Sequence, residues 1–248
     1  LQGAILTRTA SSHIRVGTFQ YAAARGNQEE IQALADYTIG RHFPDLAAAG
    51  NPYLALLEAV MERQAERVTQ WLLVGFIHGV MNTDNMSILG LTLDYGPFGF
   101  LDAYDPGFIC NHSDYHGRYA FDRQPSIGLW NLTCLAQAML PLLDVDNGEA
   151  AAEQARDVLA GYEPALVDAY VSGMRAKLGL TQARADDHEL GARLLQLMAH
   201  GQVDYTNLFR DLGGLRCDVH DERSGLRDRF VDREAFDAWA VDYRARLR

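Results

Sequence analysis

The longest regular hydrophobic pattern in the chain covers residues 54–77. Apolar side chains recur there at steps of three and four residues, and glutamate and arginine fill most of the positions between them. This spacing is typical of an amphipathic helix that buries one face. The recurring apolar positions are Leu57, Val60, Met61, Ala65, Val68, Leu72 and Phe76. We therefore expect a long helix over 54–77 that leads the chain directly into His78.

Weaker patterns of the same kind predict helices along the rest of the chain. Asn27, a residue that favours helix starts, precedes a helical pattern over 27–43 with Glu29 and Glu30 in its first turn. In the second half, helices are predicted over 126–143, 150–178 with an interruption near Pro164, 187–200, 205–212 and 233–247. The predicted fold is one mainly α domain with a small β element.

The predicted β element is the apolar run 86–93, which is typical of one or two short strands broken at Gly90. The stretch that follows, 97–125, is rich in aromatic and aspartate residues but has little periodicity. Loops of this length inside a compact domain are usually functional. We expect a long ordered loop there.

Composition excludes several classes of protein. The chain has 248 residues, of which 48% are hydrophobic, so it can bury a sizeable core. The net charge of −11 argues against a nucleic-acid partner, since phosphate contacts need a basic surface. No apolar run is long enough to span a bilayer, so no membrane partner is expected.

The cysteines and the high content of arginine and alanine bear on where in the cell the protein is found. Cys110, Cys134 and Cys217 are odd in number and far apart, which argues against a disulfide framework and indicates a reducing compartment. The abundance of arginine and alanine is typical of a GC-rich bacterial genome. We expect a cytoplasmic protein, with a mitochondrial relative as the alternative.

Candidate chemistry is concentrated just after the long helix. Protein kinases carry a His-Arg-Asp loop with an Asn five residues after the Asp, and then Asp-Phe-Gly. Here His78 and Asn85 have the kinase spacing, and Asp94 begins an Asp-Tyr-Gly sequence. Val80, however, occupies the position of the kinase base, and an aspartate occurs instead at Asp84. This departure argues against an ordinary phosphotransferase.

Oxygen-bearing side chains at both ends of the 86–93 run favour a cation site. Asn85 and Asp94 could reach the same Mg²⁺ ion, which binds carboxylates, amide oxygens and substrate phosphates. Asp84 would then be available to accept a proton from an attacking hydroxyl. The competing interpretation is that these residues only close a turn, as Asn and Asp often do.

Two further groups of residues allow alternative chemistry. Arg8 and Arg15 could hold phosphate oxygens in a planar fork, although their spacing alone favours solvated or carboxylate-paired arginines. His112, Asp114 and His116 alternate on an extended segment and could bind zinc in a metallohydrolase. A polar loop with internally hydrogen-bonded imidazoles is the preferred interpretation of that second group.

Two long stretches of the sequence carry a specific resemblance. They are HGVMNTDNMSILGLTLDYGPFGFLDAYDPGFICNHSD over 78–114 and LTRTASSHIRVGTF over 6–19. Both resemble the SelO family of kinase-fold enzymes, once classed as pseudokinases, and the similarity extends over essentially the whole chain. The resemblance implies a protein-kinase-like C-terminal lobe over residues 1–248.

The activity that the resemblance implies is protein adenylylation, or AMPylation. The enzyme would transfer AMP from Mg-ATP, with Mn²⁺ as another ion, to Ser, Thr or Tyr hydroxyls of proteins and release pyrophosphate. By the same resemblance, Asp84 is the proton acceptor, and Asn85 and Asp94 bind the metal. Asp94, Arg8 and Arg15 bind the nucleotide.

The chain also departs from the family pattern. The family has an N-terminal lobe with an ATP-anchoring lysine, whereas the single lysine here is Lys177. The resemblance therefore implies that the N-lobe and a C-terminal tail lie outside this chain, and that the chain alone binds ATP poorly and is inactive. The alternative from another functional class is a catalytically silent kinase-like module that binds proteins.

Overall fold

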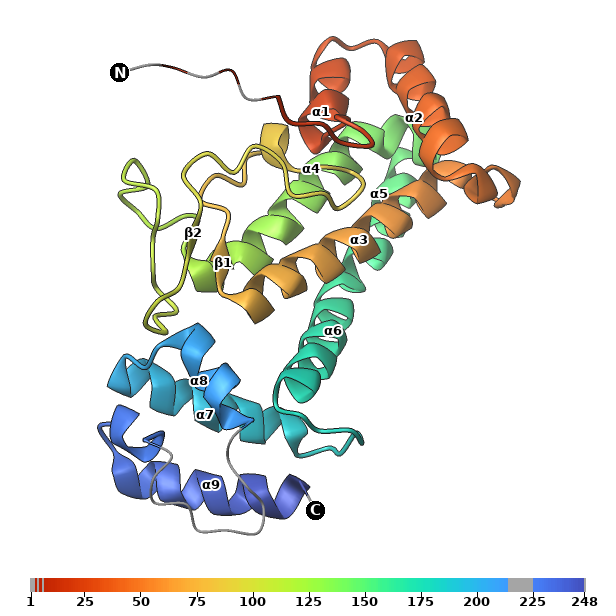
Figure 1. The fold of residues 1–248 in the computed structure, drawn as a ribbon. Coiled ribbons are helices and arrows are strands. Elements are labelled where there is room, and N and C mark those ends of the chain that lie inside the picture. Colours follow the sequence, from red (N-terminus) through yellow and green to blue (C-terminus); the bar gives the residue numbers. More distant parts are fainter. Residues whose placement is uncertain (1–2, 4, 6, 214–224, 248) are drawn as a thin grey trace. The chain divides into compact units, whose positions relative to one another are not determined.

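The computed structural model describes residues 3, 5, 7–213 and 225–247 (Figure 1). The chain divides into two compact units. The first unit consists of Leu1–Arg67, Met81–Asp94 and Leu129–Gly161, and the second of Val68–Val80, Tyr95–Gly128 and Tyr162–Arg248. The described structure is mainly helical with one two-stranded sheet, which confirms the predicted class. Cys217 lies outside the described residues.

Helices dominate the first unit. The predicted start of α2 is confirmed, because the Asn27 side chain accepts hydrogen bonds from the backbone N–H groups of Glu29 and Glu30. A helix that the hydrophobic pattern did not reveal, α1, precedes it. The elements of this unit are α1 (Val16–Ala24), α2 (Gln28–His42), η1 (Pro44–Ala48), the first part of α3 (Pro52–Val74), η2 (Thr83–Asn85), the second part of α4 (Gln124–Leu143) and α5 (Gly148–Ala160).

The predicted helix over 54–77 ends early. Helix α3 stops at Val74, because Gly75 has a φ of 71° and turns the chain out of the helix. The next residues form strand β1 (Phe76–Ile77), which pairs antiparallel with β2 (Gly99–Phe100). A Cβ on Gly75 would lie 2.9 Å from Cδ1 of Tyr205, so both the φ and the close contact require glycine.

The second unit contains the C-terminal helices. The predicted helical stretch over 150–178 is two helices that separate at Gly161, three residues before the interruption predicted near Pro164. Pro164 stands in the first turn of α6, where a backbone N–H has no partner within the helix and its loss costs little. The remaining elements are η3 (Phe121–Arg123), α6 (Tyr162–Lys177), α7 (Asp187–Gly201), α8 (Tyr205–Leu212), η4 (Arg227–Arg229) and α9 (Arg233–Leu247).

Helix α4 corrects the expectation that no apolar run is long enough to cross a membrane. In the described part of the chain, the helical segment Phe121–Leu143 is long and apolar enough to cross a membrane, by length and composition alone. However, 56% of its most apolar window is buried within the fold, as expected of a core helix. Leu132, Leu135 and Met139 are almost completely buried.

Candidate active site

A hairpin in the first unit organises the candidate site. Residues 86–93 do not form the regular strands that their pattern predicted. Instead, Met86 and Thr92 form a single antiparallel bridge, and the Gly90 N–H donates to the Ser87 carbonyl at 3.2 Å to close the turn. Because Met86 pairs with Thr92, Asn85 and Asp94 lie just outside the paired residues, at the same open end of the hairpin.

Helix α3 holds this hairpin from one side. Arg67 Nε donates to the Gly90 carbonyl at 2.5 Å, and Gln64 Nε2 donates to the Ser87 carbonyl. Gly90 has a φ of 67°, and a Cβ there would lie 2.9 Å from the Arg63 carbonyl oxygen. The turn is therefore fixed to a long helix by two polar side chains, of which the sequence pattern had assigned Arg67 only to the polar face.

The segment before α1 pairs with the other side of the hairpin. Arg15 and Ser87 form an antiparallel bridge, the Val16 N–H donates to the Met86 carbonyl at 2.9 Å, and the Ile88 N–H donates to the Ile14 carbonyl at 3.3 Å. Thr18 Oγ1 accepts from the Arg15 N–H at 3.1 Å where α1 begins. These contacts place Arg15 beside the candidate metal ligands, although it lies far from them in sequence.

Arg15 and Asp94 form an ion pair with 2.5 Å between Nη2 and Oδ2. The side chains are 29% and 47% exposed, so ligands can reach both. Asp94 has a φ of 51°, a left-handed conformation that aspartate tolerates better than most residues. The Arg15 Nε is buried and has no hydrogen-bond partner within the described structure, which leaves one strong donor unsatisfied.

Asp84 lies against the first turn of α1. It is the middle residue of η2, and its Oδ1 would be 2.1 Å from a Cβ placed on Gly17. Asn85, the next residue, is half-buried and donates its backbone N–H to the Asn82 carbonyl at 2.8 Å. Gly17 is thus part of the site. Sequence analysis missed it, because a helical glycine has no recognisable signature of its own.

Arg8, Arg15, Asp84, Asn85 and Asp94 all belong to the first unit. The structure brings Arg15 to Asp94 directly and Asp84 to the helix that Arg15 precedes. Arg8 is exposed on the extended segment before α1. The structure therefore brings together Arg15 and Asp94 directly, and places Asp84 at the start of the same helix, from three chain segments.

His78, which suggested the comparison with kinases, is a core residue of the second unit. It is fully buried, and its ring centre lies 5.3 Å from that of Trp71 and 6.4 Å from that of Tyr95. Its backbone N–H donates to Gln124 Oε1 at 3.0 Å. The imidazole is thus part of the aromatic core of the second unit.

The segment with His112, Asp114 and His116 is a loop built on Asp114. The Asp114 carboxylate accepts from the backbone N–H groups of Arg118 at 2.9 Å and Tyr119 at 2.8 Å, and both histidines are exposed. Over the residues that the structure describes, no three His, Cys, Asp or Glu side chains gather as a metal site. The segment is thus a polar loop, but its carboxylate binds backbone N–H groups where the sequence had predicted imidazole partners.

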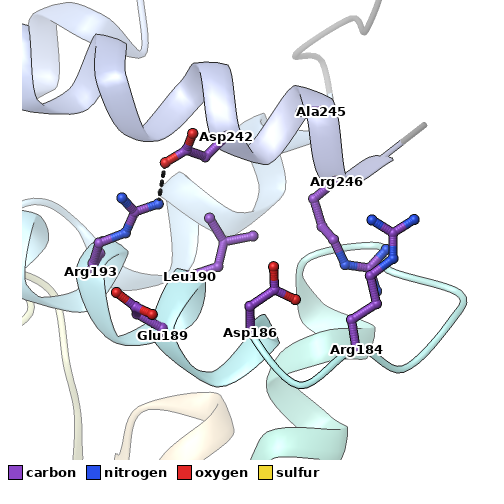
Figure 2. Close-up of a pocket in the computed structure, with 8 residues that line it drawn as sticks. All are labelled: Arg184, Asp186, Glu189, Leu190, Arg193, Asp242, Ala245 and Arg246. Atoms are coloured by element: carbon purple, nitrogen blue, oxygen red, sulfur yellow. Dashed lines mark hydrogen bonds and ion pairs between the residues drawn. The ribbon is translucent and has the colours of Figure 1, made fainter.

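A cavity of about 360 Å³ in the second unit contains none of the predicted site residues (Figure 2). It lies between α7 and α9, and three of its charged side chains form ion pairs. Arg193 and Asp242 form an ion pair at 2.6 Å, which Figure 2 marks, and Arg246 pairs with Asp187 at 2.6 Å. We interpret this cavity as part of a structural network of ion pairs.

Comparison with known proteins identifies the relatives of this chain. Three bacterial proteins, each named "Protein nucleotidyltransferase YdiU", match 98–99% of it and are 56%, 52% and 50% identical. They come from Thioalkalivibrio sulfidiphilus, Myxococcus xanthus and Rhodopseudomonas palustris. The chain spans about half of their length, since the match covers 49% of each. The family model described as "Protein adenylyltransferase SelO" matches residues 1–248, so the chain belongs to the SelO family.

Proposed function

We propose that the protein transfers AMP from ATP to Ser, Thr or Tyr hydroxyls of other proteins and releases pyrophosphate, using a kinase-like C-terminal lobe. Membership of the SelO family and the names of the relatives support nucleotidyl transfer to proteins. The observation that carries the proposal is the meeting of Arg15, Asp94 and Asp84 around the start of α1. Arg15 supplies a hydrogen-bond donor for phosphate, Asp94 a cation ligand and Asp84 a proton acceptor.

The donor atoms present suit a hard divalent cation. Asn85 offers an amide oxygen and Asp94 a half-exposed carboxylate, and both leave the same end of the hairpin. Mg²⁺ is usually held by one or two such side chains together with waters and substrate phosphates, and Mn²⁺ accepts a similar set. When bound, the cation would neutralise negative charge on the nucleotide phosphates.

Arg15 is suited to hold a phosphate group of the nucleotide. Its guanidinium presents several N–H donors in a planar fork, and one of them, Nε, has no partner. A phosphate oxygen would satisfy that donor and replace the contact with Asp94. Arg8, exposed on the segment before α1, would contribute a second guanidinium from outside the hairpin.

Asp84 is the group we assign to the acceptor hydroxyl. The hydroxyl oxygen would attack the α-phosphorus, the bond to the pyrophosphate oxygen would break, and the hydroxyl proton would pass to the Asp84 carboxylate. Gly17 leaves that carboxylate uncovered at the N-terminal end of α1, where the helix dipole favours negatively charged reactants. The chain thereby supplies a base without the aspartate of a kinase loop.

The complete enzyme is proposed to act in the cytoplasm on protein substrates. Because this chain spans about half of its relatives' length, we assign the second wall of the nucleotide cleft, an N-lobe, to the remaining half. Nucleic acid and membranes are not part of the proposal.

The test follows the two ends of ATP separately. The full-length protein is incubated with a generic protein acceptor and ATP labelled on either the α- or the γ-phosphate. We expect transfer of the α-label that is lost in Asp94→Asn and retained in Asp146→Asn, a change of an exposed carboxylate in the same unit. Transfer of the γ-label would identify an ordinary kinase, and transfer of neither label would favour a silent binding module.

A further inference from the structure

A second cavity adjoins the candidate site within the first unit. It has a volume of about 340 Å³ and lies between the segment 10–14, Thr18 of α1, and Tyr37 and Arg41 of α2. Ile14, which precedes Arg15, and Thr18, three residues after it, both line the cavity. The Arg15 backbone N–H is bonded to the Thr18 hydroxyl, so the cavity begins where Arg15 enters α1. Its size is within the range of small-ligand pockets.

The lining of this cavity carries no carboxylate, although the chain as a whole has 33 acidic and 22 basic residues. Its basic groups are Arg41 and His13. The polar groups that accompany them are the hydroxyls of Ser11, Ser12, Thr18 and Tyr37. A concave surface of hydroxyl donors around an arginine, in an acidic protein, is a surface that favours anions.

Arg41 has an arrangement that leaves its donors available. Its guanidinium carbon lies 6.0 Å from the centre of the Tyr37 ring, and it forms no ion pair with any described residue. Because Arg41 lies in the last turn of α2, its positive charge interacts favourably with the helix dipole, which is one reason for an arginine there. The dipole does not account for hydroxyl-bearing walls from two other segments that face the same space.

We propose that this cavity is an oxyanion subsite that receives the diphosphate end of the nucleotide. The proposal rests on the function proposed above, in which Arg15 holds a phosphate and pyrophosphate leaves. The backbone of Arg15 borders the cavity through Thr18, and the proposal requires that phosphates linked to the one at the Arg15 guanidinium extend into this space. Arg41 would then stabilise the negative charge that the leaving pyrophosphate gains as its bond to the α-phosphorus breaks.

The experiment measures binding of inorganic pyrophosphate to the full-length protein by calorimetry. We expect Arg41→Gln to weaken binding by roughly tenfold or more, the effect of losing one charged hydrogen-bond donor. Arg41→Lys should recover part of the affinity. The control is Arg25→Gln, which changes an exposed arginine of the same unit that pairs with Glu30, and it should leave the affinity unchanged.

Equal affinity of wild type and Arg41→Gln for pyrophosphate would overturn the subsite. So would an Arg41→Gln variant that binds pyrophosphate normally but has a raised KM only for acceptors with an acidic residue beside the target hydroxyl. That result would assign the cavity to the acceptor protein. A loss of pyrophosphate binding in Arg41→Gln without any α-label transfer by wild type would retain the subsite and refute only the proposed function.

Discussion

Gly17 and Asp84 lie so close together that no side chain fits between them. A Cβ on Gly17 would be 2.1 Å from Asp84 Oδ1 and 3.1 Å from both the Asp84 Cγ and its backbone nitrogen. Glycine inside a helix costs about 0.5–1 kcal/mol relative to alanine, so helix stability does not explain its presence in α1. The close contact explains it, and links the start of α1 to the proposed base.

Gly17→Ala should therefore reduce nucleotidyl transfer while the fold persists. The added methyl group must displace the Asp84 carboxylate, and a displacement of about 1 Å at a reacting group can lower the rate by roughly a hundredfold. The measurement is kcat for α-label transfer, with the thermal midpoint as a check of folding. Full activity in this variant would show that the position of Asp84 is unimportant for catalysis.

Gly40→Ala provides the matched control. Gly40 is an exposed glycine of α2 in the same unit, and a Cβ there would meet nothing within 4 Å. We expect normal transfer and a gain of about 0.5–1 kcal/mol in the free energy of unfolding, from the better helix propensity of alanine. If Gly40→Ala also lost activity, the effect of Gly17→Ala would be attributed to a change in helix rigidity and not to the contact with Asp84.

Arg15→Lys should separate charge from geometry. Lysine keeps the positive charge near Asp94 but lacks the planar fork and the Nε donor that is unsatisfied in the structure. We expect KM for ATP to rise by about tenfold or more, the effect of one lost charged hydrogen bond. Steady-state kinetics over a range of ATP concentrations tests this, and an unchanged KM would remove Arg15 from the nucleotide site.

Asp187 makes the second unit sensitive to acid. Its buried carboxylate accepts hydrogen bonds from Arg246, from Arg175 and from the Arg184 backbone N–H, and the Arg246 bond in particular holds the pKa of Asp187 well below its usual range. A carboxyl whose pKa is lowered on folding stabilises the protein above its unfolded pKa of about 3.9. That contribution is lost as the pH falls further.

We expect the urea midpoint of wild type to decline below about pH 4 for this reason. Asp187→Asn should have a lower midpoint at pH 7 and a flatter decline in acid. Asp242→Asn, which removes an exposed ion pair with Arg193, should change stability by at most about 1 kcal/mol. Parallel pH profiles of wild type and Asp187→Asn would contradict the assignment.

Lys177 and Tyr205 both bind the end of α3, and their contributions should not be additive. Lys177 Nζ donates to the Leu73 carbonyl at 2.6 Å, and the Tyr205 hydroxyl lies 2.9 Å from the Leu72 carbonyl and 3.2 Å from that of Leu73. Lys177 Nζ also lies 4.5 Å from the centre of the Tyr205 ring. Each single change, Lys177→Met or Tyr205→Phe, should cost about 1–2 kcal/mol.

A double-mutant cycle on the free energy of unfolding measures the coupling. Because the two side chains share an acceptor and touch each other, we expect an interaction energy of about 0.5 kcal/mol or more. Strict additivity would show that each side chain caps the helix independently.

Much of the fold was predictable because helices are local. The predicted ranges 205–212 and 233–247 coincide with α8 and α9, and Asn27 caps α2 as expected. The errors arise where tertiary contacts decide. The end of α3 depends on Tyr205 meeting Gly75, and β1 depends on pairing with β2, two contacts that no periodicity records.

The candidate site was predictable in its residue types but not in its geometry. The spacing of Asp84, Asn85 and Asp94 pointed to a hairpin, which the bridge between Met86 and Thr92 bears out in a looser form. That Asp94 is the partner of Arg15 could not be predicted, because the pair depends on backbone pairing between segments distant in sequence. The carboxylate-paired arginine favoured by spacing alone is present in Arg15, next to an unsatisfied donor that spacing could not show.

In the proposed function, the ion pair between Arg15 and Asp94 couples the binding of the nucleotide to that of the cation. A phosphate would take Arg15 from Asp94 and a cation would take Asp94 from Arg15, so each ligand would free the group that the other requires. Such coupling is reciprocal: the nucleotide raises the affinity for the cation by the same factor as the cation raises the affinity for the nucleotide. The proposed site would thereby respond to the two together more strongly than to either alone.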